Sequence, residues 1–188
     1  QFSAEKPQAF DPYLLATVQN RLLAYTFDRS RKEIVSAKMG GASGAYLWLA
    51  HWVARAANKP VAMVEGEFSR EGSWKNTVLS LGADPERLGA RFWAELPRAD
   101  EELLATIVVG EVLRDFFAVT AEELTLLHDG GATRKEIVLV SILARMQERT
   151  IYDVWHDSEA QQSWGALLAI YRLSVESIEL FLSKSMAA

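Results

Sequence analysis

Cysteine is absent from the 188 residues of this sequence. Its absence excludes disulfides, thiolate nucleophiles, iron–sulfur clusters and zinc sites with cysteine ligands. Long apolar runs are missing as well, since even the stretch 45–57 is interrupted by His51 and Arg55. A helix that crosses a bilayer needs about 18 or more apolar residues. We therefore predict no membrane span.

An excess of positive charge is also lacking. Lys and Arg number 20 against 25 Asp and Glu, which gives a net charge of -5 at pH 7. This balance opposes binding to phosphate backbones and to anionic lipid. We expect no nucleic-acid partner. The 49% of hydrophobic and 24% of charged residues are typical of a globular protein.

The common catalytic motifs do not occur. The sequence has no Gly-x-Ser-x-Gly, no His-Glu-x-x-His and no calcium loop. The glycine-rich stretch 40–44 lacks a preceding strand and a Gly-Lys-Ser/Thr ending, so neither phosphate-loop fingerprint applies. We predict no cofactor, and we lean towards a protein that is not an enzyme.

What the sequence does contain is an internal repeat. Residues 21–95 align without a gap on residues 111–185, at an offset of 90, with 13 identities in 75 positions, where composition alone would give about five. The identities include Gly40-Gly41 with Gly130-Gly131, and Ser73-Trp74 with Ser163-Trp164. Side chains shared by both copies indicate scaffold, and side chains in one copy only indicate where a function was added.

Helix signals repeat at the same offset. Capping residues such as Ser73 and Ser163 precede apolar periods of 3.6, and no segment alternates as a strand does. We predict an all-α fold, an internally duplicated helical bundle of two six-helix units related by a pseudo-two-fold axis. Residues 1–97 form the first unit and 98–188 the second, packed as one globular domain. The expected helices are 11–27, 31–38, 44–58, 61–67, 74–81 and 85–95, then 101–117, 121–128, 134–148, 151–157, 164–172 and 175–185.

Copy one contains a succession of three features, which are Gly72-Ser73-Trp74, a short helix, and Gly82-Ala83-Asp84-Pro85-Glu86. This succession resembles a pattern of uncharacterised, often exported, bacterial helical proteins, in which a Gly/Ser-Trp helix start is followed by a Gly-x-Asp-Pro-Glu turn. The resemblance implies no activity. The chain starts at Gln1 without Met, which fits either a cleaved export signal or a start trimmed for expression. We expect a periplasmic or extracellular location, with the cytoplasm as the alternative.

Trp48 and Trp52 lie four residues apart on one helix, next to His51. Their counterparts in copy two are Val138 and Ile142, so the tryptophans are special to copy one. Core packing is the commoner role of such a pair, but it could also line a surface for a ligand or a partner. We take Trp48, Trp52 and His51 as the candidate binding surface.

Two His-Asp pairs suggest an alternative. His128-Asp129 and His156-Asp157, with His51 as a further ligand, resemble the metal-dependent phosphohydrolase class, whose signature is a His, a His-Asp and a distant Asp. Such a site would need these groups within about 2.0 to 2.2 Å of one ion. Both pairs also suit helix ends, where His and Asp favour the dipole and the turn.

Residues 124–155 suggest a second alternative. The stretch Gly131-Ala132-Thr133-Arg134-Lys135-Glu136-Ile137 is similar to the start of activator-type helix-turn-helix modules. Against it, 133–148 reads as one continuous helix, and the following helix carries Asp rather than Lys or Arg. Our hypothesis is therefore a non-enzymatic binding or assembly protein, with a protein partner or self-association possible. A metal-dependent hydrolase and a DNA-binding regulator remain the alternatives.

Overall fold

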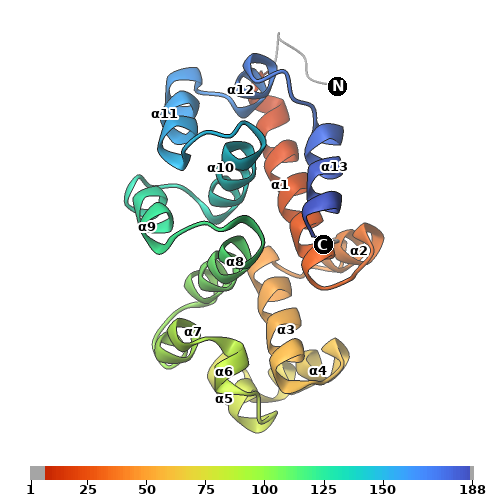
Figure 1. Ribbon diagram of the computed structural model, residues 1–188. Coiled ribbons are helices and arrows are strands. Elements are labelled where there is room, and N and C mark those ends of the chain that lie inside the picture. The colour runs from red at the N-terminus through yellow and green to blue at the C-terminus, as the bar shows by residue number, and fades with distance from the viewer. Residues whose placement is uncertain (1–6, 187–188) are drawn as a thin grey trace. The chain divides into compact units, whose positions relative to one another are not determined.

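A computed structural model describes residues 7–186 of the chain. This part of the chain forms thirteen helices and no strand (Figure 1), which confirms the all-α prediction. Within it, no helix combines the length and the apolar character that crossing a membrane requires. The helices are α1 (Pro7–Thr26), α2 (Arg31–Met39), α3 (Gly44–Ala57), α4 (Val61–Glu71), α5 (Trp74–Ser80), α6 (Pro85–Leu88), α7 (Ala90–Glu95), α8 (Glu101–Phe117), α9 (Ala121–Asp129), α10 (Arg134–Met146), α11 (Ile151–Gln161), α12 (Trp164–Ile170) and α13 (Val175–Ser185).

The helices divide into two compact units. Of the described residues, 7–32 and 112–186 form the discontinuous unit, and 33–111 form the continuous unit. The boundaries of the units fall inside α2 and α8. The sequence-based division between residues 97 and 98 follows the repeat, whereas these units follow the packing, so α1 belongs with the helices of the second copy.

The core of the discontinuous unit is built around α1 and α10. Helix α1 packs against α10, α12 and α13, and its Leu14, Val18 and Leu22 are buried. Helix α10 is buried on nearly every side from Ile137 to Ala144, and seven of these eight residues are apolar. Apolar burial on this scale is the main stabilising contribution to the unit.

The continuous unit is centred on α3. This helix packs against α4 and α6, and its residues from Leu47 to Ala54 are all buried. Tyr46, Phe68 and Trp74, from α3, α4 and α5, form an aromatic cluster with ring centroids 4.4 to 5.5 Å apart. The cluster joins the three helices.

Helix starts follow the predicted caps. The Ser73 and Ser163 side chains accept the N–H groups of Asn76 and Ala166, which would otherwise lack a partner. Thr120 with Glu123 and Thr133 with Glu136 form complete capping boxes. Asp84 caps α6, with Pro85 in its first turn.

The turns after the helices repeat as well. Ten of the eleven described residues with positive φ fall into five pairs that are 90 positions apart. Gly72 (φ 67°) matches Gln162 (φ 53°), and Gly82 (φ 61°) matches Arg172 (φ 55°). The other pairs are Asp28 with Ala118, Gly41 with Gly131, and Asn58 with Glu148.

Four of the expected helices differ from the structure by more than two residues or by a break. Helix α1 begins at Pro7 instead of Asp11 and has Pro12 inside it, because the Asp11 carboxylate caps another helix, as described below. The predicted helix 85–95 is two helices, since Gly89 at φ 89° interrupts it. Helices α4 and α11 extend four residues beyond the predicted ends, to Glu71 and Gln161.

Candidate ligand-binding site

The tryptophans predicted as a surface lie inside the continuous unit. Trp48 is 0% exposed, Trp52 is 3% exposed and His51 is 8% exposed. The Trp52 indole N–H donates to the Leu88 carbonyl oxygen over 3.2 Å, and the Arg55 guanidinium lies 4.1 Å from the Trp52 ring centroid. In the folded unit these side chains are part of the core, so their placement does not match a binding surface.

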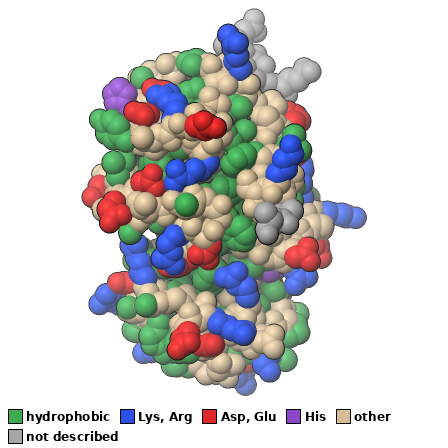
Figure 2. All heavy atoms as spheres, in the orientation of Figure 1, with side chains coloured by type: hydrophobic (Ala, Val, Ile, Leu, Met, Phe, Trp, Pro, Cys, Tyr) green, Lys and Arg blue, Asp and Glu red, His purple; other side chains and the backbone are tan. Residues whose placement is uncertain are grey.

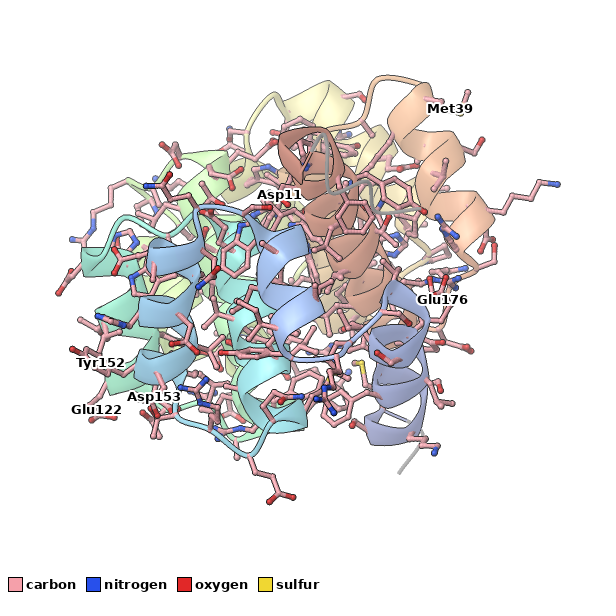
Figure 3. All side chains as sticks on the ribbon, turned by 90° about the horizontal axis from the view of Figure 1, so that it is seen from above. Asp11, Met39, Glu122, Tyr152, Asp153 and Glu176 are labelled. Atoms are coloured by element: carbon pink, nitrogen blue, oxygen red, sulfur yellow. The ribbon has the colours of Figure 1, made fainter. Side chains whose placement is uncertain are left out.

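The residues proposed as metal ligands do not form one cluster. Among residues 7–186, no group of three or more His, Asp or Glu side chains is placed to hold a single ion. His51 belongs to α3 of the continuous unit, whereas His128-Asp129 ends α9 and His156-Asp157 lies within α11, both in the discontinuous unit. His128, Asp129 and His156 are exposed, and His156 stacks on Tyr152. Tyr152 is labelled on α11 in Figure 3.

Asp157 is engaged by two protein groups. Its carboxylate accepts hydrogen bonds from the Arg149 guanidinium and from the Tyr171 hydroxyl, the latter over 2.7 Å. The Tyr171 hydrogen bond and Arg149 lower the pKa of Asp157 below its ordinary value. Burial, together with the bond to Asp157, raises the pKa of Tyr171. This arrangement ties α11 to the end of α12 and occupies the carboxylate.

The segment with a helix-turn-helix outline consists of α9, α10 and the first turn of α11. Helix α10 runs unbroken from Arg134 to Met146, and α11 contains no Lys or Arg between Ile151 and Gln161. On the face shown in Figure 2, basic and acidic side chains are intermixed. A DNA-reading second helix needs cationic side chains, so the composition of α11 lends no support to this alternative.

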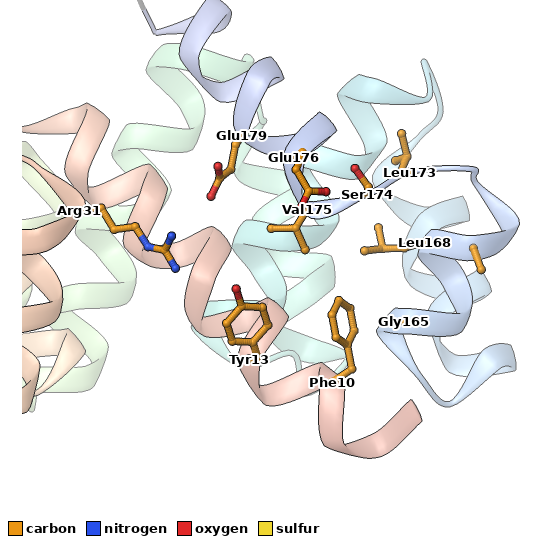
Figure 4. A pocket seen from close by; sticks show the side chains of 11 residues that line it. Phe10, Tyr13, Arg31, Gly165, Leu168, Leu173, Ser174, Val175, Glu176 and Glu179 are labelled. Atoms are coloured by element: carbon orange, nitrogen blue, oxygen red, sulfur yellow. The ribbon is translucent and has the colours of Figure 1, made fainter. Parts of the chain in front are cut away.

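A recess in the discontinuous unit lies between α1, α12 and α13 (Figure 4). Its volume is about 410 Å³, which falls in the range of about 300 to 1,000 Å³ that small-molecule sites occupy. Most of its lining is apolar or aromatic. The lining residues are Phe10, Tyr13, Arg31, Gly165, Leu168, Ala169, Leu173, Ser174, Val175, Glu176 and Glu179.

Two aromatic rings form one wall of this pocket. Phe10 and Tyr13, on α1, have ring centroids 6.1 Å apart, and Tyr13 is 54% exposed. In Figure 4 both rings point from α1 towards Val175. An aromatic side chain that stays this exposed beside a concave apolar surface is available to contact a ligand.

The charged side chains that line the pocket differ in whether the protein supplies them with a partner. The Glu179 carboxylate pairs with the Arg21 guanidinium over 2.6 Å. Glu176 lies in the first turn of α13, where backbone N–H and the Ser174 side chain lower the pKa of its carboxyl group. Arg31 lines the pocket (Figure 4) and makes no ion pair within residues 7–186.

The comparison of the two aligned segments did not identify Phe10 and Tyr13 as candidate site residues. Phe10 and Tyr13 precede the aligned residues 21–95, so the comparison of the copies cannot mark them as special to one copy. Phe10 and Tyr13 are three residues apart on one helix face, and this spacing is the one signal that could have found them.

Comparison with known proteins gives no match. No family model matches the chain, nor does any curated protein or solved structure. The segment 72–86 resembles exported bacterial helical proteins, and this resemblance therefore stays a prediction.

Proposed function

We propose that this protein binds a small amphipathic molecule with an anionic group in the pocket between α1, α12 and α13. The observation that carries the proposal is the pair Phe10 and Tyr13, which lines a cavity of about 410 Å³ while Tyr13 remains 54% exposed. The apolar body of the ligand would lie on these rings and against Leu168 and Val175. Burying it there would remove apolar surface from water on both partners.

Arg31 would receive the anionic group of the ligand. Arg21 neutralises Glu179. Glu176 stays ionised, and the positive end of the α13 dipole offsets part of its negative charge. The guanidinium of Arg31 is thus the cation in the lining that has no carboxylate partner in the described chain. A planar guanidinium suits a carboxylate or a sulfonate because it can donate two parallel hydrogen bonds.

The lining favours binding over catalysis. It contains no histidine, and Ser174 is committed to the capping box of α13. A nucleophile with an adjacent general base, the usual arrangement for covalent catalysis, is not among these side chains. The sequence-based hypothesis was a binding or assembly protein. We keep binding as the function, but we propose a site at Phe10 and Tyr13 on α1 instead of Trp48 and Trp52.

The first test is a titration with anilinonaphthalene sulfonate, an aromatic anion whose fluorescence rises in an apolar site. We expect saturable binding to the full chain, and about tenfold weaker binding after Tyr13→Ala or Arg31→Gln, which corresponds to about 1.4 kcal/mol. Lys32→Gln is the matched control, because it removes the same charge from the next, exposed residue. This variant should bind as the parent does.

Two results would contradict the proposal. One is equal weakening by Arg31→Gln and Lys32→Gln, which would reduce the effect to overall charge. The other is displacement of the probe by decylamine as readily as by decanoate, since the two share an apolar chain and differ in the sign of their charge. Circular dichroism of each variant verifies that the helices are retained.

We also propose that the chain is two copies of one helical unit with their first helices exchanged. Helices α2 to α5 begin 90 residues before α9 to α12, and five positive-φ pairs keep the same offset. Asp11 accepts the backbone N–H groups of Trp164 and Gly165, each over 2.9 Å. Its counterpart 90 residues on, Glu101, accepts the indole N–H of Trp74 over 3.2 Å. Each acid therefore contacts the Ser-Trp start of the copy that does not contain it.

A further inference from the structure

A second cavity in the discontinuous unit has a different chemistry. It measures about 480 Å³ and lies between the start of α1, the first turn of α10 and the adjoining ends of α11 and α12. Two tryptophans, Trp155 and Trp164, and three acids, Asp11, Glu136 and Glu159, are part of its lining, which contains no lysine or arginine. The site therefore combines aromatic faces with negative charge.

The tryptophans form a fixed wall. Their ring centroids are 6.5 Å apart, with 38° between the ring planes. A Cβ atom at Gly130 would lie 2.8 Å from Nε1 of Trp155, a distance below normal contact. Gly130 has a φ of -71°, so its backbone conformation does not require glycine. Glycine is needed here because a side chain would clash with the indole of Trp155. The turn before α10 thus accommodates this ring.

The continuous unit shows the same location filled. There Tyr46, Phe68 and Trp74 pack together, with Phe68 and Trp74 centroids 4.4 Å apart. The residues 90 positions later are Glu136, Ser158 and Trp164. Two aromatic rings have been replaced by a carboxylate and a small hydroxyl, and all three of these residues line the open cavity. The cavity is therefore a difference between the copies, not a property of the shared scaffold.

The carboxylates are positioned by the helices. Asp11 is fixed by the first N–H groups of α12, and Glu136 is fixed by the backbone N–H of Thr133 over 2.8 Å. Glu159 is exposed and makes no ion pair within the described chain. A ligand that enters meets the two indoles together with acids from α1, α10 and α11. An anion would be repelled, and a neutral apolar molecule would leave the acids without a counterion.

We propose that this cavity binds an organic cation, an alkylated ammonium group that lies on the face of Trp155 and is neutralised by the surrounding carboxylates. Tryptophan is the aromatic side chain that attracts cations most strongly, and an alkylated ammonium combines a positive charge with an apolar surface. This site is separate from the pocket of Phe10 and Tyr13, so either proposal can fail without the other.

The test uses choline and its uncharged carbon isostere, 3,3-dimethylbutan-1-ol, with the full chain. Indole N–H signals in NMR spectra report binding at Trp155 and Trp164. We expect choline to shift these signals with saturation and the isostere to bind about tenfold more weakly or not at all. Equal binding of the two would overturn the proposal, because it would leave no role for the charge. No saturable shift with choline would overturn it too.

Variants distinguish choline binding in this cavity from effects of overall charge or of folding. Ser158→Phe restores the ring found at Phe68 of the other copy, so it should fill the cavity and abolish choline binding while the protein stays folded. Glu159→Gln should weaken choline binding several-fold, whereas Glu122→Gln, an exposed acid on α9, should not. Folded Ser158→Phe protein that binds choline as the parent does would also reject the site. Binding of anilinonaphthalene sulfonate should be unchanged by Ser158→Phe, which separates this result from the first proposal.

Discussion

Asp157 illustrates how single side chains join neighbouring helices in this protein. Its carboxylate binds Arg149 and Tyr171, and in the continuous unit Glu67 binds Arg70 and Ser80 in the same way. Positions 67 and 157 are 90 apart. An acid at this position of α4 or α11 therefore connects its helix to the end of the next helix in both units.

The Asp157 contact predicts a pH-dependent effect of Tyr171→Phe. The folded state lowers the pKa of Asp157, so its contribution to stability is present above the ordinary carboxyl pKa of about 3.9 and is lost as pH falls below it. Removing the hydroxyl should raise the pKa of Asp157 and lower the unfolding free energy by about 0.5 to 1 kcal/mol near pH 7, because the pair is partly exposed. The difference should shrink towards pH 2.

Urea unfolding at several pH values and carboxyl titration by NMR measure both effects. Tyr152→Phe is the control, since Tyr152 lies on α11 with its side chain exposed and stacks on His156. A Tyr171→Phe variant that keeps the parent pKa at Asp157 would show that the hydrogen bond has no influence on the carboxyl.

At the scale of helices, two turns that lie 90 positions apart differ in a way that can be tested. The turn after α5 uses Gly82 at φ 61°, and the matching turn after α12 uses Arg172 at φ 55°. Non-glycine residues are strained in this region by about 1 to 2 kcal/mol. Arg172→Gly should therefore raise the unfolding free energy by about 0.5 to 1 kcal/mol, after the entropy that glycine loses on folding.

The reverse substitution, Gly82→Arg, should lower the unfolding free energy by a similar amount. A Cβ atom at Gly82 would meet nothing within 4 Å, so backbone strain is the cause and not a steric clash. Thermal unfolding should shift by about 2 to 4 °C per kcal/mol in a chain of this length. If the two variants moved stability in the same direction, the strain explanation would be wrong.

Most helices could be predicted from the sequence because their signals are local. Ser73, Thr120 and Thr133 mark helix starts through hydrogen bonds to residues three positions on. The mostly apolar stretch 137–144 marks α10 as a buried helix. The role of Asp11 could not be predicted from local sequence signals. Its carboxylate caps α12, more than 150 residues away, and no local rule distinguishes this role from capping its own helix.

The candidate site was harder to predict for a related reason. Trp48 and Trp52 stand out in the sequence, yet their helix α3 is buried on nearly all sides. Phe10 and Tyr13 are inconspicuous, but α1 packs against α10, α12 and α13 and places them beside α13. Which side of a helix faces solvent depends on the helices that pack against it, and packing between distant segments is not visible in local patterns.

For the whole molecule, the division into two units predicts how a core substitution spreads. Leu22 in α1 and Leu88 in α6 are both 0% exposed, and replacing either by Ala should cost about 2 to 5 kcal/mol. We expect Leu22→Ala to reduce amide exchange protection mainly in α10, α12 and α13, the helices that α1 contacts, and Leu88→Ala mainly in α3. Native-state hydrogen exchange measures each helix separately because local openings differ in free energy. A uniform loss of protection in both variants would show that the two units unfold as one.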